Sequence, residues 1–458
     1  MASWCGYGLG GPAERRAKIA QVTGHPSHAF TSPGTLRERQ RCTLAPTPFL
    51  RGAMKEEVTT YERMLSGRGS TTTALAISIF LRGTTDRSGM IDHLREQRHK
   101  AGSDLYHSVF LVQALCWEGR IPEAEEVVRD TLLRYADLSI EGLRDRITIR
   151  SSGARIIDSH FETYSGSPMQ NLGFFEHALE EPTTGRTYSL VTKLATREYA
   201  GREPLFFSEV YAPGTALAAI VPRPVDMFTP AGSELSIMTM EKVPGTELVV
   251  QAMTGSEVDR FIGVYRAVHD IGHEQVEHLF QNVPFEIAHS HAYLASAMHM
   301  SHDPGHFAAM NAWLLASVRD RGYSTWVQQL VERMVQALER AAFHRRIVPA
   351  RHYGLLHGDM HRFNVLRDGD AFRIIDWGRC TTGPKGIDLA VLFRRFPYER
   401  TVAALERAGW WSGWPVENRI LFAYSLVLVS VMIDLQGIKD EQPAQLFAPA
   451  TRAVIDQL

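Results

Sequence analysis

Short alternating runs of apolar and polar residues follow residue 151 and predict a β-rich segment. The connections between the first three runs contain the sequences SGSP and EPTTG. Because such turn sequences reverse the chain within a few residues, they favour an antiparallel meander of five strands. The predicted strands are Arg155–Glu162, Gly173–Leu179, Thr187–Leu194, Pro224–Thr229 and Leu235–Glu241.

Helical periodicity flanks this segment on both sides. Residues 104–136 predict two helices that are separated at Gly119, with Pro122 near the start of the second, where its fixed φ is tolerated. The string ALCWEGRIPEAEEVVRDTLLRYA resembles one tetratricopeptide-type hairpin. A solenoid needs about three such repeats, so we expect a helical region packed against the rest of the protein. Beyond Gly245 the pattern is mostly helical, except that VLR and FRIIDW flank a DGD turn and predict a β-hairpin within residues 354–378.

These patterns divide the chain into four parts. Residues 1–53 mix Gly, Pro, Ser, Thr and Arg without apolar periodicity, so we expect a disordered leader, with Met54 as a candidate for the native start. Residues 54–150 are assigned to a helical N-terminal region, 151–243 to a β-rich lobe and 244–458 to a mainly helical lobe. A length of 458 residues suits several cooperating domains.

Charge and cysteine content argue against several classes of protein. The 49 Lys and Arg against 51 Asp and Glu give a net charge of −2, which favours neither nucleic acid nor a membrane surface as partner. Four cysteines without a CxxC pair suit a reducing compartment. The uncharged run Gly69–Leu81 is too short to span a bilayer, and the N-terminus lacks a signal peptide's hydrophobic core. We therefore expect a cytoplasmic protein.

The polar residues of HGDMHRFN and RIIDWG have a spacing that phosphoryl transfer can use. Asp359 and Asn364 lie five positions apart on a predicted loop, and Asp376 follows a predicted strand. The same separation joins the base and a metal-binding asparagine in the catalytic loop of protein kinases. In such a layout Asp359 accepts the hydrogen bond of a substrate hydroxyl, while Asn364 and Asp376 supply oxygen ligands for Mg²⁺. Turn or helix capping explains a lone Asp or Asn, but not three in this order.

The motif HGDxHxxN, followed by a strand ending in IDW, resembles the aminoglycoside phosphotransferase and choline kinase family. The resemblance covers Ser151 to the C-terminus and implies an α+β, bilobal protein-kinase-like fold, to which this chain adds an N-terminal helical extension. It also implies ATP and Mg²⁺ as cofactors. Asp388, in KGIDLAVLF, is similar to the family's downstream aspartate, which ties the catalytic loop in place; a helix N-cap is the alternative. We expect His357 to brace that loop by hydrogen bonding.

A lysine and a carboxylate are predicted to orient the nucleotide from the β-rich lobe. Lys193 lies at the end of the third predicted strand, where a kinase lysine reaches the α- and β-phosphates. A solvent-facing lysine on an edge strand is the alternative. Glu209, in PLFFSEVYAP, is the predicted partner of Lys193, with Glu203 and Glu198 as competitors.

Two further segments are predicted to contact the nucleotide. The loop SGSPMQNLG, with Gly166 and Gly173 as its flexible points, takes the place of a glycine-rich loop over the phosphates, although it does not spell GxGxxG. The fifth strand ends at a predicted hinge. Backbone groups near Glu241 and Val243 would bond to adenine there, and Met240 would line the pocket, although methionine at alternating positions is also typical of core.

Two side-chain clusters leave alternatives open. His269 and His273 lie one helical turn apart, a separation that zinc sites use, but neither an HExxH motif nor a cysteine partner accompanies them. The string AGWWSGWP carries three tryptophans, which could form an aromatic cage for a quaternary ammonium group, although packing is favoured.

Taken together, these features predict transfer of the ATP γ-phosphoryl group to a hydroxyl of a small molecule, such as an aminoglycoside, amino alcohol or sugar. A protein kinase is disfavoured because HGD replaces HRD, IDW replaces DFG and no APE-like element follows. The other alternative is an inactive nucleotide-binding scaffold that recruits a protein partner through its helical N-terminal region. Four acidic residues could serve a cationic acceptor: Glu274, Glu277, Asp303 and Asp434.

Overall fold

The central element of the N-terminal half is an antiparallel sheet with the strand order β1-β2-β3-β5-β4. The computed structural model describes residues 84, 86–100, 105–162, 171–197, 202–280, 304–433 and 442–458. The five-stranded antiparallel sheet predicted from the alternating pattern is confirmed, and two strands have the predicted bounds. The predicted meander holds only for the first three strands, because β5 lies between β3 and β4. The strands are β1 Arg155–Glu162, β2 Asn171–Glu180, β3 Thr187–Thr196, β4 Pro224–Phe228 and β5 Leu235–Glu241.

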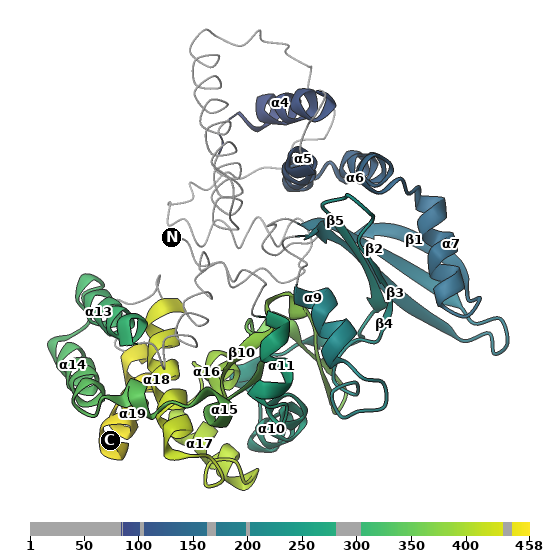
Figure 1. Ribbon diagram of the computed structural model, residues 1–458. Helices are drawn as coiled ribbons and strands as arrows, with labels where there is room; N and C mark the ends of the chain where they lie inside the picture. The colour runs from purple at the N-terminus through teal and green to yellow at the C-terminus, as the bar shows by residue number, and fades with distance from the viewer. Residues whose placement is uncertain are drawn as a thin grey trace, which may run out of the picture.

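Within the described residues, four helices precede the sheet, and together they cover one of its faces. One hydrophobic core contains residues of these helices together with residues of the strands, among them Phe110, Leu132, Ile147, Phe175 and Leu194. Figure 1 shows α6 and α7 lying beside the sheet. The helices and the sheet therefore form one packed unit, in which the covered face is the outer face of the β-rich lobe. The helices are α4 Arg87–His99, α5 Leu105–Trp117, α6 Ile121–Ala136 and α7 Ile140–Arg150.

An arginine joins the last of these helices to the sheet. Arg146 on α7 forms an ion pair with the buried Asp226 on β4, and its Nη2 lies 3.1 Å from Asp226 Oδ1. The Arg146 guanidinium also lies over the ring of Phe228, 3.7 Å from the ring centroid. Charge pairing and a cation–π contact thus act at the same point.

The C-terminal half is mainly helical and has a second hydrophobic core, which includes Phe261, Leu314, Trp377 and Phe422. Its two small sheets have the orders β10-β7 and β6-β8-β9, and β8 and β9 are the hairpin predicted around the DGD turn. The strands are β6 Thr246–Glu247, β7 Tyr353–Leu356, β8 Val365–Asp368, β9 Ala371–Ile374 and β10 Thr381–Pro384. The pairing of β10 with β7 was not predicted, because TTGP has no strand-like alternation.

Helices surround these small sheets.

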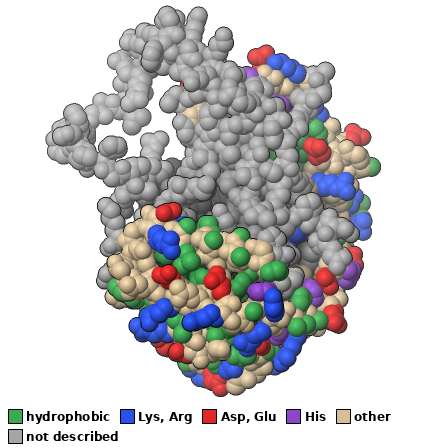
Figure 2. All heavy atoms as spheres, turned by 60° about the vertical axis from the view of Figure 1, so that its left-hand side comes forward, with side chains coloured by type: hydrophobic (Ala, Val, Ile, Leu, Met, Phe, Trp, Pro, Cys, Tyr) green, Lys and Arg blue, Asp and Glu red, His purple; other side chains and the backbone are tan. Residues whose placement is uncertain are grey.

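On the face drawn in Figure 2, basic and acidic side chains are interspersed over the C-terminal half. Within the described residues, no helix is long and apolar enough to cross a membrane. The longer helices are α10 Gly255–His269, α11 His273–Phe280, α13 Pro304–Asp320, α14 Thr325–Arg340, α16 Ile387–Phe393, α17 Tyr398–Arg407, α18 Val416–Ile433 and α19 Gln442–Gln457. The shorter ones are α9 Arg202–Leu205, η1 Phe206–Val210, η2 Val250–Ala252, η3 Phe343–Arg346, α15 Pro349–His352, η4 Arg362–Asn364 and η5 Trp377–Arg379.

The two halves join through the segment after β5. The chain passes through Gly245 into β6, which pairs with β8 of the C-terminal half. Gly245 has a φ of +120°, and a Cβ there would lie 2.4 Å from the backbone oxygen of Arg367. Only glycine allows so close an approach, so this residue determines how the hinge enters the second lobe.

We predict that Arg146→Ala lowers the free energy of unfolding by about 2 kcal/mol, because it leaves the buried Asp226 carboxylate without its main partner. Arg150→Ala is the matched control. Arg150 lies 3.5 Å from the same carboxylate but is more than half exposed, so we expect a loss below about 0.5 kcal/mol. Urea unfolding followed by circular dichroism measures both, and equal losses would contradict this account of the contact.

Candidate active site

The backbone of the loop that carries HGDMHRFN is hydrogen-bonded to one buried carboxylate. Asp388 on α16 accepts hydrogen bonds from the backbone N–H groups of His357, at 2.6 Å, and Gly358, at 3.1 Å. The hydroxyl of Tyr265 donates to the same carboxylate at 2.5 Å. Burial raises the pKa of Asp388, although the hydrogen bonds from Tyr265, His357 and Gly358 act in the opposite direction. The N-cap of α16 is Gly386, so the alternative role of Asp388 as an N-cap is excluded.

His357 connects this loop to the segment that precedes Asp376. Its Nδ1 accepts from the backbone N–H of Asp359 at 3.2 Å, and its Nε2 lies 2.9 Å from the carbonyl oxygen of Ile375. One neutral tautomer, with the proton on Nε2, satisfies both contacts. The ring also packs edge-on against Trp377, with centroids 4.8 Å apart. His357 thus holds the loop against the segment before Asp376 by hydrogen bonding, which is the role predicted for it.

The glycine of the HGD motif allows the loop to approach the segment after Asp376. Gly358 has a φ of +77°, and a Cβ there would lie 2.1 Å from the backbone oxygen of Arg379. No side chain fits this contact without a shift of backbone. The close approach places Arg379 beside the neighbouring aspartate, with Arg379 Nε 3.5 Å from Asp359 Oδ2.

Asp359 and Asn364 are joined within the loop. The side-chain nitrogen of Asn364 donates to the backbone oxygen of Asp359 at 2.9 Å, and the backbone N–H of Ile375 donates to the backbone oxygen of Asn364 at 2.9 Å. The Asn364 amide oxygen takes no part in either bond. The Nε2 atom of His361 lies 3.7 Å from Asp359 Oδ1, and burial lowers the pKa of His361.

Lys193 pairs with two carboxylates, one from each lobe. Its Nζ lies 2.8 Å from Glu203 Oε2 and 2.9 Å from Asp376 Oδ1. The predicted partnership with Glu209 is therefore wrong, since Glu209 is exposed and Glu203 on α9 points inward. Sequence could not separate the two, because a π-helix follows α9 and changes which side chains face the sheet. Glu198 lies outside the described residues.

Asp376 is held in an unusual backbone conformation. Its φ of 63° and ψ of 67° are left-handed, which is uncommon for a residue other than glycine. Burial acts to raise its pKa, but the charge and hydrogen bond of Lys193 prevail, so the pKa of Asp376 lies below the usual value. The backbone N–H of Trp377 donates to Glu203 Oε1 at 3.1 Å. A strained residue at such a place often marks a functional site.

The donor atoms here fit a hard divalent cation. The carboxylate of Asp376 and the amide oxygen of Asn364 are the oxygen ligands that Mg²⁺ prefers. The hydrogen bond from Ile375 to Asn364 brings the residue before Asp376 next to Asn364. Lys193 bonds to Oδ1 of Asp376, and Asp376 and Asn364 are the residues that could hold a metal ion here.

The remaining predicted nucleotide contacts lie around this centre. Met240 pairs with Val191 on β3, and Glu241 ends β5 with its backbone N–H bonded to the Arg223 oxygen at 2.9 Å. Val243 follows in the segment that joins the lobes. Gly173 lies within β2, at a register shift, with a φ of +130°, and a Cβ there would clash with the Phe161 ring at 2.5 Å. It is therefore a packing position rather than a flexible loop residue, and Gly166 lies outside the described residues.

His269 forms one packed group with two tryptophans, Trp410 and Trp414. The ring of His269 stacks on Trp410 with centroids 4.4 Å apart, and Trp414 Nε1 donates to His269 Nε2 at 2.8 Å. Trp410 and Trp414 are both buried, so these rings form core rather than a cage. His273 instead contacts Thr382 Oγ1 through its Nδ1 at 2.6 Å. The two histidines thus have different partners and do not share a metal site.

Three contacts of this centre were not anticipated from the sequence. Phe206 stacks on Trp377 with centroids 4.0 Å apart, and Arg202 donates to the backbone oxygen of Cys380 at 3.0 Å. Burial lowers the pKa of Arg202 to about 10. Arg379 beside Asp359 is the third. The sequence could have indicated this contact, because Arg379 directly follows IDWG. The contacts of Phe206 and Arg202 depend instead on how α9 and the residues after it dock between the lobes (Figure 1).

A family model described as the phosphotransferase enzyme family, APH, matches residues 183–419, which is more than half of the chain. The chain belongs to the phosphotransferase enzyme family. Its fold is the predicted α+β, bilobal protein-kinase-like fold, with a five-stranded antiparallel N-lobe and a mainly helical C-lobe. No curated protein matches the sequence.

Three solved structures illustrate what this phosphotransferase family member is similar to. The apo form of a thermostable mutant of aminoglycoside phosphotransferase APH(4)-Ia is 14% identical, with 68% of this chain and 98% of that chain covered and a TM-score of 0.33. Spectinomycin phosphotransferase APH(9)-Ia in complex with ADP and spectinomycin is 14% identical, with 73% and 98% covered and a TM-score of 0.35. Amicoumacin kinase hAmiN in complex with AMP-PNP and Ca²⁺ is 10% identical, with 69% and 96% covered and a TM-score of 0.34.

We predict that Glu203→Ala lowers the free energy of unfolding by about 3 kcal/mol, since it leaves the ammonium of Lys193 buried with one carboxylate fewer. Glu209→Ala is the control, because Glu209 lies six residues later on η1 and is exposed. This variant should lose less than about 0.5 kcal/mol of the free energy of unfolding. Urea unfolding of both variants checks this. If Glu209→Ala lost as much stability as Glu203→Ala, Glu209 would again be the favoured partner of Lys193, as predicted from sequence.

A second pair of variants tests the contact between Gly358 and Arg379. Gly358 and Gly369 both have a positive φ, but a Cβ on Gly369 would meet nothing within 4 Å. Gly369→Ala should therefore cost about 1 kcal/mol, the strain of the backbone alone. Gly358→Ala should cost about 3 kcal/mol or more, because the backbone must also move. Equal melting temperatures of the two variants would contradict the close approach.

Proposed function

We propose that this protein transfers the γ-phosphoryl group of ATP to a hydroxyl of a small molecule. The observation that carries the proposal is the convergence of Lys193 from the sheet with Asp359, Asn364 and Asp376 from the C-lobe on one polar centre. Phosphoryl transfer requires cations against the phosphates and a carboxylate at the attacking hydroxyl. The groups for each of these tasks are present.

Asp359 is the proposed acceptor of the substrate's hydroxyl proton. Its carboxylate lies beside Arg379 and His361, on a loop whose backbone is bonded to Asp388. A rigid loop keeps the carboxylate in line with the bond to be broken, and such positioning supplies most of the rate in this class of reaction. Burial lowers the pKa of His361. The ring beside Asp359 is therefore neutral and does not form an ion pair that would hold the Asp359 carboxylate away from the substrate hydroxyl.

Lys193 is the proposed contact to the α- and β-phosphates, with Glu203 as the residue that orients it. Asn364 and Asp376 would hold Mg²⁺, which would neutralise phosphate charge when bound. Asp376 stays ionised because its pKa is held low, which keeps it available as a ligand.

The acceptor is proposed to be a small hydroxylated molecule such as an aminoglycoside, amino alcohol or sugar. A quaternary ammonium cage built from Trp410 and Trp414 is not part of the proposal, because both rings are buried against His269. Among the acidic residues considered for a cationic acceptor, Glu277 is already paired with His273 at 3.2 Å. Asp303 and Asp434 lie outside the described residues.

An inactive scaffold is the alternative from another class of function. The helices α4–α7, which would recruit the partner, share a core with the sheet, so only the sides of these helices that face away from that core could take part in recruitment. The retained lysine, base and metal ligands support activity. Nucleotide binding without turnover across a broad panel of acceptors would favour the scaffold.

We predict that Asp359→Asn lowers turnover at least about 10³-fold, because the variant cannot accept the hydroxyl proton, while ATP affinity changes less than about threefold. A screen of hydroxylated metabolites and antibiotics with coupled ADP detection first identifies the acceptor. Asp368→Asn, on the exposed turn of the β8–β9 hairpin, is the control and should retain full activity. Parental turnover in a folded Asp359→Asn variant would refute the assignment.

A further inference from the structure

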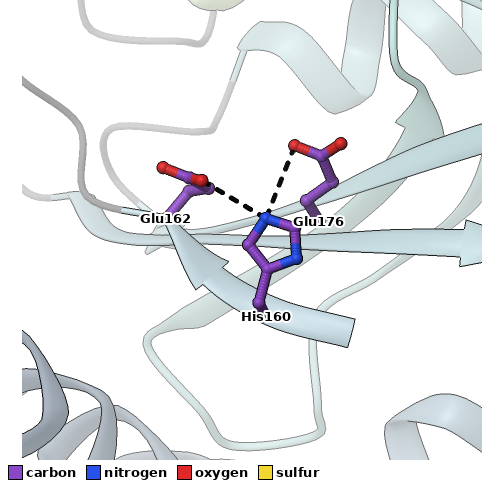
Figure 3. Close-up of side chains that lie close together, drawn as sticks. All are labelled: His160, Glu162 and Glu176. Carbon is purple, nitrogen blue, oxygen red and sulfur yellow. Dashed lines mark ion pairs between the residues drawn. The ribbon is translucent and has the colours of Figure 1, made fainter. Parts of the chain in front are cut away.

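Two histidines outside the proposed site have contrasting surroundings. Figure 3 shows His160, whose Nε2 lies 3.2 Å from Glu162 Oε1 and 3.9 Å from Glu176 Oε2. The first two of these side chains are exposed, and Glu176 also pairs with Lys242, so we assign no ligand to this group. His269, at the end of α10, is only 13% exposed and packs among aromatic rings. Its contacts lead toward the proposed active site.

The imidazole of His269 holds the indole of Trp414. Trp414 Nε1 donates to His269 Nε2 at 2.8 Å, and the two rings stack with centroids 5.6 Å apart. The other ring nitrogen, Nδ1, lies 3.4 Å from Asp270 Oδ1. Because an indole N–H can only donate, Nε2 must be unprotonated, and the proton of the neutral ring is on Nδ1, toward Asp270. The bond from Trp414 therefore exists only in the neutral form of His269.

Trp414 in turn lies against Gly386, the N-cap of α16. Gly386 has a φ of +95°, and a Cβ there would lie 2.6 Å from Trp414 Cη2. Only glycine meets both conditions, so the indole contacts the backbone directly where α16 begins. Asp388 is two residues further along and accepts from the backbone N–H groups of His357 and Gly358. The position of the indole therefore affects the carboxylate that fixes this loop.

A second side chain of α10 acts on the same carboxylate. Tyr265 lies one helical turn before His269, so both side chains are on the same face of α10. The hydroxyl of Tyr265 donates to Asp388 at 2.5 Å, and its ring lies 6.5 Å from that of Trp410, centroid to centroid. Trp410 also stacks on His269, with centroids 4.4 Å apart. The helix α10 thus holds α16 at two points, one directly and one through the tryptophans.

We infer that neutral His269 is a positioning residue, which fixes the start of α16 through Trp414 and thereby the carboxylate of Asp388. Asp388 fixes the loop that carries Asp359, and phosphoryl transfer depends mainly on such positioning. The inference rests on the proposed function, since that function gives the loop its task. The contacts themselves are open to a test that needs no turnover.

The same contact makes the loop sensitive to acid. Residues 408–415, which carry the tryptophans, contain no ionisable side chain. The charged groups near His269 are Lys385, Asp270 and Arg266. Burial and the charge of Lys385 lower the pKa of His269 to about 4, against the attraction of Asp270. A histidine released from this packing has a pKa of about 6.5. As the pH falls from about 6.5 toward 4, only the released form takes up a proton, so acid favours release.

Hydrogen exchange of the full chain, followed by mass spectrometry, tests this role without need of an acceptor. The backbone N–H groups of His357 and Gly358 report on their bonds to Asp388. His269→Leu cannot accept from Trp414, so the peptide that contains these two groups should exchange at least about tenfold faster, while peptides of β3 keep the parental rate. His269→Gln should keep the parental rate throughout, because its amide oxygen accepts the same bond at any pH.

Acid gives a second readout, one that packing alone would not change. Between about pH 7 and about pH 5, the parent should lose about tenfold more protection of this peptide than His269→Gln, which shares the titration of Asp388 and of every other group. His278→Gln, at an exposed position on α11, is the matched control and should follow the parent.

Two results would overturn the inference. One is equal acid sensitivity of this peptide in the parent and in His269→Gln, a comparison that decides the matter even if His269→Leu does not fold. The other is an increase in exchange in folded His269→Leu that is absent from this peptide or equally large in β3. Failure of the proposed function is a separate result, since it would appear as a parent that protects this peptide but turns over no ATP with any acceptor.

Discussion

One ammonium group links the two lobes of this protein. Lys193 projects from the third strand of the sheet and pairs with Glu203 of α9 and with Asp376 of the C-lobe. An ammonium buried this deeply is costly unless carboxylates surround it, so its position requires that both partners be in place. Glu203 in turn accepts from the backbone of Trp377, and Phe206 stacks on the same residue. The placement of α9, the strained backbone of Asp376 and the closeness of the lobes all depend on this group.

A second buried ionisable group, the carboxylate of Asp388, fixes a loop within the C-lobe. Asp388 accepts hydrogen bonds from two backbone groups of the loop that carries HGDMHRFN and from Tyr265. The loop can therefore present Asp359 without freedom to rotate, while Gly358 allows it to lie against Arg379. Rigid positioning of a few polar groups, rather than a special nucleophile, is what phosphoryl transfer demands of a protein.

The N-terminal helices change which face of the sheet is available. In this chain α4–α7 share a core with the outer face of the sheet, and Arg146 secures α7 to β4. The outer face carries buried residues such as Phe175 and Leu194, whereas the opposite face carries Lys193, which bonds to Asp376 of the C-lobe.

The sequence by itself determined the five strands, the hairpin around the DGD turn and four of the residues that meet at the centre, which are Lys193, Asp359, Asn364 and Asp376. Period-two alternation and turn chemistry are local properties, and the spacing from Asp359 to Asn364 is written in the chain. Tertiary structure alone decided that Glu203, not Glu209, pairs with Lys193, because a π-helix sets the direction of each side chain. It also decided that Gly173 is a packing position and that Trp410 and Trp414 enclose His269. These outcomes depend on which distant segments come into contact, and such contacts leave no periodic trace in a single sequence.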